Sequence, residues 1–311
     1  MSKQKALVTG GAGFIGSHLV ENLINEGYEI MLVDNLLSGK KENTKNFICE
    51  NIYYDDIGSK EILKKVAEFD PDICFHLAAQ ASVVISVDNP MLDFEHNILQ
   101  PLKLIQVLLS TNCRKLIFSS SGGTIFGEPK VIPTSEVDFA GEPESPYGIA
   151  KKRLNEFIEL MLNENSNMTY SILNFSNVYG PRQDPNGEAG VISIFTNKMI
   201  SNSEPTVFGD GEQTRDYIYV QDVVDALISS SKIDSNLFLN IGTGIETSVN
   251  ELVSVLKNTI GYDGNVTYKP KRDGELLRSV LDNSKAKKEL DWEPKFSLDE
   301  GISHLIKWLK D

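Results

Sequence analysis

Near its N-terminus the chain reads Ala6-Leu7-Val8-Thr9-Gly10-Gly11-Ala12-Gly13-Phe14-Ile15-Gly16. The run predicts a buried strand that turns directly into a helix, with three glycines, Gly10, Gly13 and Gly16, at the turn. Glycine permits a tight turn and lets main-chain N–H groups approach a ligand, while a helix N-terminus carries roughly half a positive charge. The stretch therefore predicts a cradle for the pyrophosphate of a dinucleotide. By itself, the triplet also fits an ordinary strand-to-helix turn.

An acidic residue, Asp34, ends the second apolar run, residues 29–33. A carboxylate at this place can accept hydrogen bonds from both ribose hydroxyls of an adenosine and repels a 2′-phosphate. The residue types therefore favour NAD over NADP as the cofactor. The alternative is that Asp34 caps the end of its strand.

Tyr147 and Lys151 form the second informative pair. They stand four residues apart, so on a helix they share one face. A free tyrosine titrates near about 10, and a neighbouring lysine cation lowers its pKa toward the range of a useful acid or base. The alternative is a surface pair, but Ser145-Pro146 directly before it and the cradle upstream favour a catalytic pair in a nicotinamide-dependent enzyme.

The order of the apolar runs predicts an α/β fold with a doubly wound parallel sheet, because strands alternate with helices through residue 175. The predicted strands cover residues 5–8, 29–33, 72–76, 115–118 and 169–175. The predicted helices cover residues 14–25, 60–68, 92–110 and 147–162, and Pro101 is expected to bend the third of these.

After Gly180 the pattern changes to short mixed elements rich in glycine and proline. Helices are predicted at residues 191–201, 221–230, 248–259 and 298–309. We therefore expect a NAD-binding domain over residues 1–180 and a smaller mixed α/β substrate-binding lobe over residues 181–311, with some of this chain returning to the first domain.

Composition excludes several classes of protein. The 311 residues carry 30 Lys and Arg against 44 Asp and Glu, a net charge of −14, which disfavours binding to nucleic acid or an anionic membrane. Cys49, Cys74 and Cys113 are odd in number and far apart, so neither a disulfide framework nor a metal site is expected. Without a signal-peptide core or an apolar run long enough for a membrane span, we expect a cytoplasmic protein.

Together these segments resemble the extended short-chain dehydrogenase/reductases, and among them the UDP-glucose 4-epimerase group of nucleotide-sugar enzymes. The resemblance runs nearly end to end. The matching motifs are Thr9 to Gly16, Val33-Asp34-Asn35, His76-Leu77-Ala78-Ala79-Gln80, Ser145-Pro146-Tyr147, Asn177-Val178-Tyr179-Gly180-Pro181-Arg182-Gln183, Arg215-Asp216-Tyr217 and Asn240-Ile241-Gly242-Thr243-Gly244. The resemblance implies a Rossmann fold, NAD as cofactor and a UDP-sugar as substrate.

Carried over position by position, the resemblance also implies which residues contact NAD. They are Gly10, Gly13, Phe14, Ile15, Gly16, Asp34, Asn35, Ser38, Gly39, Asp56, Ile57, Leu77, Ala78, Ala79, Gln80, Asn97, Tyr147 and Lys151. The substrate contacts that it implies are Ser121, Tyr147, Asn177, Val191, Phe208, Arg215, Arg272 and Glu275. Arg215 and Arg272 would neutralise the diphosphate of the UDP-sugar in an otherwise acidic chain.

The family places a serine or threonine hydroxyl beside Tyr147 and Lys151 as the third catalytic group. Here Phe118 is followed by Ser119-Ser120-Ser121-Gly122-Gly123-Thr124, and an ungapped count from Gly127 puts Gly122 at the hydroxyl position. A related subgroup has a hydroxyl residue followed by two glycines, so we expect Ser121 in this role and Thr124 as the alternative. Related 4,6-dehydratases carry Asp-Glu where this chain has Gly123 and Thr124, so dehydration lacks its acid and base.

What remains is reversible hydride transfer at C4. The resemblance implies that Tyr147 takes the proton of the 4-hydroxyl as hydride leaves C4. The 4-keto sugar then rotates about its diphosphate link, and hydride returns to its opposite face. Seven residues beyond Arg272, the gate position of the family corresponds to Ser279, and a serine leaves room for a 2-acetamido group. We therefore expect a UDP-glucose/UDP-galactose epimerase that tolerates the N-acetylated sugars.

Two alternatives stay open. Residues 184–191 resemble some UDP-glucuronate 4-epimerases, with Arg182 as the candidate partner of a sugar carboxylate. A protein that binds NAD and nucleotide sugars without turnover is the second, although it would not need Tyr147 and Lys151. The resemblance further implies a homodimer through the helices 92–110 and 147–162. The apolar stripe Ile98, Leu102, Ile105 and Leu109 fits such a contact, or packing onto the protein's own sheet.

Overall fold

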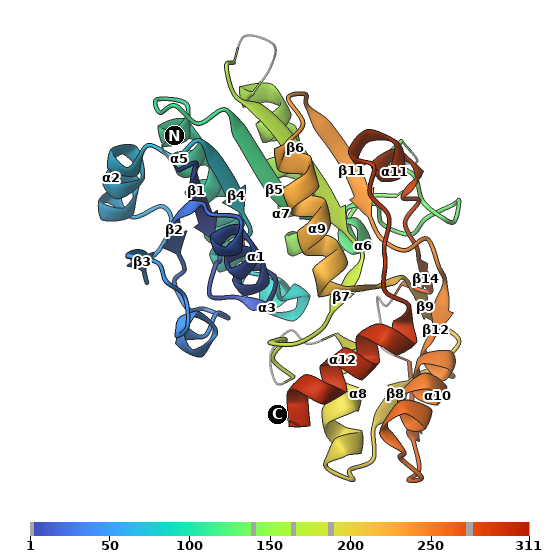
Figure 1. Cartoon of the computed structure of the whole chain (residues 1–311). Helices are drawn as coiled ribbons and strands as arrows, with labels where there is room; N and C mark the ends of the chain where they lie inside the picture. The colour runs from blue at the N-terminus through green and yellow to red at the C-terminus, as the bar shows by residue number, and fades with distance from the viewer. Residues whose placement is uncertain (1–2, 138–140, 163–165, 186–189, 272–275, 311) are drawn as a thin grey trace.

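Seven parallel strands form the central sheet, in the order β11-β6-β5-β4-β1-β2-β3 (Figure 1). The structure is a computed structural model that describes residues 3–137, 141–162, 166–185, 190–271 and 276–310. The strands are β1 (Lys5–Thr9), β2 (Glu29–Val33), β3 (Asn51–Tyr53), β4 (Ile73–His76), β5 (Lys115–Ser121), β6 (Thr169–Phe175) and β11 (Leu237–Ile241). The predicted α/β class with a parallel doubly wound sheet is confirmed.

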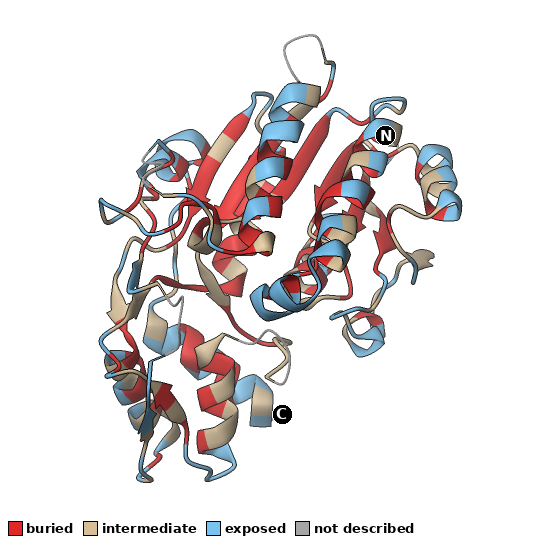
Figure 2. Ribbon diagram, turned by 180° about the vertical axis from the view of Figure 1, so that it is seen from behind, coloured by how far each residue is buried: buried red, intermediate tan, exposed pale blue. Residues whose placement is uncertain are grey.

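Helices cover both faces of this sheet, which explains why its strands are apolar on both sides. Along β1, Ala6 and Val8 point to one face and Leu7 to the other, and all three are buried. Figure 2 shows the strands buried between helices whose outer surfaces are exposed. On the face of Ala6 and Val8 lie α1 (Phe14–Asn25), α9 (Val220–Ser231) and α11 (Ser284–Leu290). On the other face lie α2 (Lys60–Phe69), α5 (Gln100–Leu108) and α7 (Pro146–Met161).

The helix predicted over residues 92–110 is interrupted. The structure has α3 (Val83–Asp88), α4 (Pro90–Phe94), a π-helical turn η2 (Glu95–Leu99) and then α5, which ends at Leu108. Proline lacks an N–H group, and its ring crowds the carbonyl four residues earlier. The widened turn directly before Pro101 accommodates both effects, so the expected distortion lies in the turn ahead of the proline.

After β6 the chain leaves the sheet and builds a second lobe, which lies below the sheet in Figure 1. Three small sheets pair β7 with β10, β9 with β12 and β14, and β8 with β13. Their bounds are β7 (Asn177–Tyr179), β8 (Thr206–Phe208), β9 (Thr214–Arg215), β10 (Tyr217–Tyr219), β12 (Thr247–Ser248), β13 (Thr267–Lys269) and β14 (Arg278–Ser279). The helices of this lobe are α8 (Val191–Ile200), α10 (Val249–Ile260) and α12 (Leu298–Lys310).

The chain crosses back between the two lobes. After β10 it returns through α9 to β11, which pairs with β6 at the edge of the main sheet. The second lobe has its own apolar core, formed by α8, α10 and α12 with β10. Two short elements complete the structure, the 3₁₀ turn η1 (Lys41–Thr44) and α6 (Gly122–Ile125). Within the described residues, no helix combines the length and apolar character needed to cross a bilayer.

Candidate active site

A pocket of about 730 Å³ lies at the carboxyl ends of β1, β2, β4, β5 and β6. We call it the central pocket. Parallel sheets place ligand sites at this edge, because the loops that follow the strands converge there. Most residues implied as NAD contacts line it. They are Gly10, Gly13, Phe14, Ile15, Gly16, Asp34, Asn35, Ser38, Gly39, Ile57, Leu77, Ala78, Ala79, Gln80, Tyr147 and Lys151.

The glycine cradle is the turn between β1 and α1. Gly10 has φ +72°, and a Cβ added to it would lie 2.7 Å from the main-chain nitrogen of Ala78 on the neighbouring loop. A side chain is therefore excluded there by both conformation and space. Gly13 is the N-cap of α1, and no side chain caps this helix end. The first residues of the helix, Phe14 to Gly16, line the pocket, so the positive end of the helix dipole fits a dinucleotide pyrophosphate.

Asp34 is held at the adjoining end of β2. Its Oδ2 accepts a hydrogen bond from the Ala12 N–H at 2.9 Å, and its Oδ1 accepts one from the Leu36 N–H at 2.8 Å. Burial raises the pKa of this carboxyl, and the N–H groups of Leu36 and Ala12 oppose that rise. A Cβ added to Gly39 would lie 2.5 Å from Asp34 Oδ1, so a glycine is required against the carboxylate. The main chain thus fixes an acceptor that can receive ribose hydroxyls.

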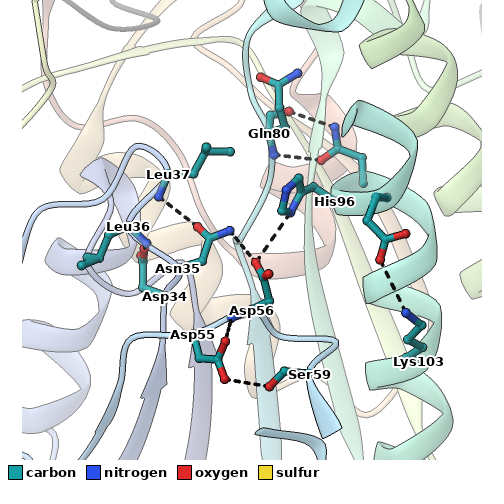
Figure 3. Close-up of polar contacts among 12 residues, drawn as sticks. Asp34, Asn35, Leu36, Leu37, Asp55, Asp56, Ser59, Gln80, His96 and Lys103 are labelled. Atoms are coloured by element: carbon teal, nitrogen blue, oxygen red, sulfur yellow. Dashed lines mark hydrogen bonds and ion pairs between the residues drawn. The ribbon is translucent and has the colours of Figure 1, made fainter. Parts of the chain in front are cut away.

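The side chain of Asn35 is held by Asp56, which does not itself line the central pocket. Its Nδ2 donates to Asp56 Oδ1 at 2.8 Å, and His96 Nδ1 lies 3.9 Å from the same oxygen (Figure 3). His96 lines the central pocket, although no sequence motif singled it out. Asp56, implied as an adenine contact, therefore joins the loop after β2 to the turn η2.

Asn97 also lies behind the wall of the central pocket. Its Oδ1 accepts the Gln80 N–H at 3.1 Å, and its Nδ2 donates to the Gln80 carbonyl at 2.9 Å. The side chain therefore pairs with the main chain of Gln80 as a neighbouring strand would. Asn97 therefore fixes the position of Gln80, which lines the pocket.

Tyr147 and Lys151 lie in the first two turns of α7. Ser145 begins this helix, because its Oγ accepts the Gly148 N–H at 3.1 Å and Pro146 takes the first helical position. Lys151 Nζ donates to the Ser119 carbonyl at 2.9 Å and lies 5.9 Å from the centre of the Tyr147 ring. Burial lowers the pKa of Lys151 to about 7, and the charge of Asp93 opposes this shift.

Three consecutive serines at the end of β5 line the central pocket, and Ser121 is the third of them. Successive side chains of a strand alternate, so Ser119 and Ser121 share one face. Ser119 Oγ donates to the His76 carbonyl at 3.3 Å, which is the strand-end bond expected for it. Thr124 Oγ1 donates to the Ser121 carbonyl at 3.4 Å, and Thr124 does not line the central pocket. Ser121 therefore lines the same pocket as Tyr147, whereas Thr124 does not.

Four of the residues implied as nucleotide contacts are described by the structure, and they belong to the second lobe and do not line the central pocket. Asn177 lies in β7, Val191 begins α8, Phe208 ends β8 and Arg215 ends β9. Arg272 and Glu275 lie outside the described residues. The register of β14 places Ser279 beside Arg215. A Cβ added to Gly123 would lie 3.9 Å from Ser279 Oγ, so β14 approaches α6, the short helix that follows Ser121.

Several residues of the central pocket were missed by sequence reasoning. They are Leu37, Lys40, Asn43, Ala81, Ser82, Ile85, His96, Gln100, Phe175, Ser176, Gln183 and Asp184. Lys40 Nζ pairs with Asp184 Oδ2 at 2.7 Å, which joins the loop after β2 to the segment after β7. The sequence held one signal, because Gln183 ends a motif that carries the family resemblance.

The family model for GDP-mannose 4,6 dehydratase matches residues 7–305. The chain is 46% identical to the UDP-glucose 4-epimerase of Thermotoga maritima, solved with UDP-glucose, with a TM-score of 0.95 and 99% of each chain covered. It is 36% identical to the UDP-glucose 4-epimerase of Thermus thermophilus in complex with NAD, with a TM-score of 0.91 and 99% of each chain covered.

A third similar structure is the UDP-N-acetylglucosamine 4-epimerase of Methanobrevibacter ruminantium in complex with UDP-N-acetylmuramic acid. It is 35% identical, with a TM-score of 0.92, and the match covers 100% of this chain and 99% of that one. The fold agrees with these matches. The chain belongs to the GDP-mannose 4,6 dehydratase family of extended short-chain dehydrogenases/reductases, as its motifs predicted.

Proposed function

We propose that the protein is an NAD-dependent UDP-hexose 4-epimerase that interconverts UDP-glucose and UDP-galactose. One observation carries the proposal: Tyr147 and Lys151 line the same pocket as the glycine cradle and Asp34. The relatives named above bear out the sequence-based predictions of an isomerase and of NAD as its cofactor. The name of the family does not describe the reaction here, because Gly123 and Thr124 supply neither the acid nor the base that dehydration needs.

NAD fits the residues that line the central pocket. The cradle would hold its pyrophosphate, Asp34 the adenosine ribose, and residues 77–80 the length of the dinucleotide. When bound, NAD would supply reversible hydride transfer at C4 of the sugar. Tyr147 takes the proton of the 4-hydroxyl and gives it back, and Lys151 stabilises the phenolate form of Tyr147 by its charge. Ser121 donates a hydrogen bond to the same sugar oxygen.

The second lobe binds the UDP group in this proposal. Arg215 and Arg272 neutralise the diphosphate, Phe208 lies at the uracil, Glu275 at its ribose, and Asn177 and Val191 at the wall between them. The division of work follows the chain, with NAD held by residues 1–180 and the nucleotide sugar mainly by residues 181–311. The small side chain of Ser279 admits a 2-acetamido group, so the N-acetylated sugars are also substrates.

The test is NMR of the sugar after incubation of the purified protein separately with UDP-glucose, UDP-N-acetylglucosamine and UDP-glucuronate. We expect inversion at C4 with the first two sugars, without added NAD or after NAD is supplied. The matched control is Tyr147→Phe, which removes only the hydroxyl and is expected to lower turnover by about 10²- to 10⁴-fold while NAD still binds. Absence of inversion in every sample that contains NAD would instead support a binding protein without turnover.

UDP-glucuronate 4-epimerisation is the second candidate, because of Arg182. This residue lines the central pocket, and its Nη2 donates to Glu21 at 2.7 Å. Its Nη1 is buried and has no hydrogen-bond partner among the described residues. This nitrogen is therefore a candidate donor to a carboxylate oxygen of the sugar. Faster inversion of UDP-glucuronate than of UDP-glucose in the same assay would favour this candidate.

We also propose a homodimer, in which the partner covers an apolar face of α3, α4 and α7. These helices pack against one another, and their exposed apolar side chains include Val84, Val87, Met91, Phe94, Ile149, Phe157 and Leu160. The stripe considered from the sequence does not supply this face, because Ile98 and Ile105 are buried against the protein's own sheet. Light scattering should give a dimer, and Leu160→Lys, at a side chain that is 69% exposed, should give a monomer.

A cytoplasmic location completes the proposal. It is supported by Cys74 and Cys113, which are buried as free thiols, and by Cys49, which is also unpaired. Such thiols persist in a reducing compartment. Fractionation of cells that express the protein would test this location.

A further inference from the structure

Asp93 is a buried carboxylate on α4 that no motif singled out. Only 1% of its surface is exposed. Burial of a carboxylate is unfavourable because the charge loses its hydration, unless other groups compensate for the loss. Asp93 does not line the central pocket. Its surroundings must therefore compensate its charge. Of the two side chains that donate to it, Gln80 lines the central pocket and Asn97 lies behind the wall of that pocket.

One oxygen of Asp93 accepts two hydrogen bonds. Gln80 Nε2 donates to Oδ1 at 2.9 Å, and Asn97 Nδ2 donates to the same Oδ1 at 2.8 Å. Gln80 Nε2 also donates to the Ser82 carbonyl at 2.9 Å. Together with the two bonds between Asn97 and the main chain of Gln80, these contacts fix the wall of the central pocket over residues 80–82. We call Asp93, Gln80, Asn97 and Ser82 the Asp93 cluster.

The charge of Asp93 also acts on Lys151, which lies in α7, a helix that packs against α4. Burial raises the pKa of Asp93, and the hydrogen bonds from Gln80 and Asn97 and the charges of Lys151 and His96 oppose this rise. Conversely, burial lowers the pKa of Lys151, and the negative charge of Asp93 opposes that shift. Since α4 packs against α7, both effects follow from the fold.

The other groups around Lys151 cannot replace this negative charge. Tyr147 on its own helix is neutral until it loses its proton. From β5, the Ser119 carbonyl accepts a hydrogen bond from Lys151 Nζ, and the centre of the Phe118 ring lies 4.6 Å from the same nitrogen. His76 on β4 is buried, and burial lowers its pKa to about 3, so it is uncharged at neutral pH.

We propose that Asp93 is a positioning residue of the reaction, which holds the pocket wall through Gln80 and Asn97 and places a buried negative charge on the helix that packs against the helix of Lys151. The second role rests on the proposed function, because Lys151 acts on Tyr147 only as a cation. The first role rests on the contacts of the Asp93 cluster alone.

The shared acceptor Oδ1 permits a sharp test. Asp93→Asn keeps an oxygen that can accept from Gln80 and Asn97 but removes the charge, whereas Asp93→Ala removes both. Glu95→Gln is the matched control, because it removes one acidic charge two residues away at a side chain that pairs with Lys103. The thermal midpoint and bound NAD of each variant show whether the fold and the pocket persist.

The decisive readout is the titration of Lys151, followed by NMR of ¹³C-labelled lysines in the cofactor-free protein and assigned with Lys151→Arg. We expect Asp93→Asn to lower the pKa of Lys151 by about one unit, which reduces its protonated fraction by up to about tenfold at alkaline pH. Its deficit in kcat should therefore grow from about pH 6 to about pH 9, while Glu95→Gln matches the wild type. Asp93→Ala should also weaken NAD binding.

An unchanged titration of Lys151 in Asp93→Asn would overturn the role in charge. Unchanged NAD binding in Asp93→Ala would overturn the role in holding the wall. Neither readout needs turnover, so a wild-type protein without epimerase activity would defeat the proposed function and leave this test intact.

Discussion

The ammonium group of Lys151 donates to the main-chain carbonyl of Ser119 at 2.9 Å, two residues before Ser121 on β5. This bond joins the helix that carries Tyr147 to the strand that carries the third hydroxyl. The three groups of the proposed reaction are thus fixed relative to one another by the packing of α7 on β5.

Lys151→Met should lower kcat by about 10²- to 10⁴-fold, because Tyr147 then has no neighbouring cation to stabilise its phenolate. The matched control is Lys152→Met on the same helix, where the lysine pairs with Glu142 on the surface. Steady-state kinetics with UDP-galactose should show the loss only in the first variant. Equal kcat values for both variants would remove Lys151 from the mechanism.

Asp34→Asn should weaken NAD binding by about 10- to 100-fold, the range expected when a charged hydrogen-bond acceptor is lost. It should also reduce the preference for NAD over NADP, since the negative charge that repels a 2′-phosphate is gone. Calorimetric titration of the cofactor-free protein with both dinucleotides measures the two effects. Asp263→Asn, at an exposed carboxylate in the second lobe after α10, serves as the control and should leave both affinities unchanged.

Ser121→Ala should lower kcat by about tenfold or more, because the sugar oxygen loses a hydrogen bond in the transition state. Thr124→Ala should keep nearly full activity, since its hydroxyl already bonds to the Ser121 carbonyl. The two variants, assayed side by side with UDP-glucose, decide which hydroxyl acts. A larger loss in Thr124→Ala would reverse the assignment.

Ser279→Tyr should abolish activity on UDP-N-acetylglucosamine and spare activity on UDP-glucose. The approach of Ser279 to Gly123 means that a larger side chain fills space near Ser121. Ser279→Ala is the control for loss of the hydroxyl alone and should keep both activities. The ratio of kcat/KM for the two sugars is the measurement, and an unchanged ratio in Ser279→Tyr would contradict the gate.

Lys115→Met should destabilise the fold by about 1–3 kcal/mol, because three carbonyls lose their donor. Lys115 Nζ donates to the carbonyls of Ile233 and Ser235 at 2.8 Å and of Tyr170 at 3.3 Å. These bonds tie the start of β5 to its neighbours at the edge of the sheet. The catalytic residues lie at the opposite end of β5, so the activity of the folded variant should persist.

The same lysine gives stability a pH dependence with a defined sign. Burial lowers the pKa of Lys115 to about 8 from 10.5, so between these values the unfolded chain holds a proton that the folded chain has lost. The free energy of unfolding therefore rises with pH across this window. Urea titrations should show the difference between wild type and Lys115→Met increasing from about pH 8 to about pH 10.5. A difference that stays constant would contradict the shift.

Five strands of the sheet were predictable because they are apolar and separated by helices with clear periodicity. β11 (Leu237–Ile241) was not predicted, although it has five residues, because the chain after residue 180 was assigned mainly to the substrate-binding lobe. β3 and the strands of the second lobe were missed because they contain two or three residues, too few for an alternating pattern. The stripe through Ile98 and Ile105 shows the same limit, since its period defines a face but not what that face packs against.

The sequence by itself determined the strand, the cradle, Asp34 and the helical pair Tyr147 and Lys151, because each is a local pattern whose geometry follows from a few adjacent residues. Only the tertiary structure decided that the helix of Asp93 packs against the helix of Lys151 and that Ser279 approaches Gly123. Those relationships join segments far apart in the chain, and they depend on how helices and strands pack, which residue spacing does not encode.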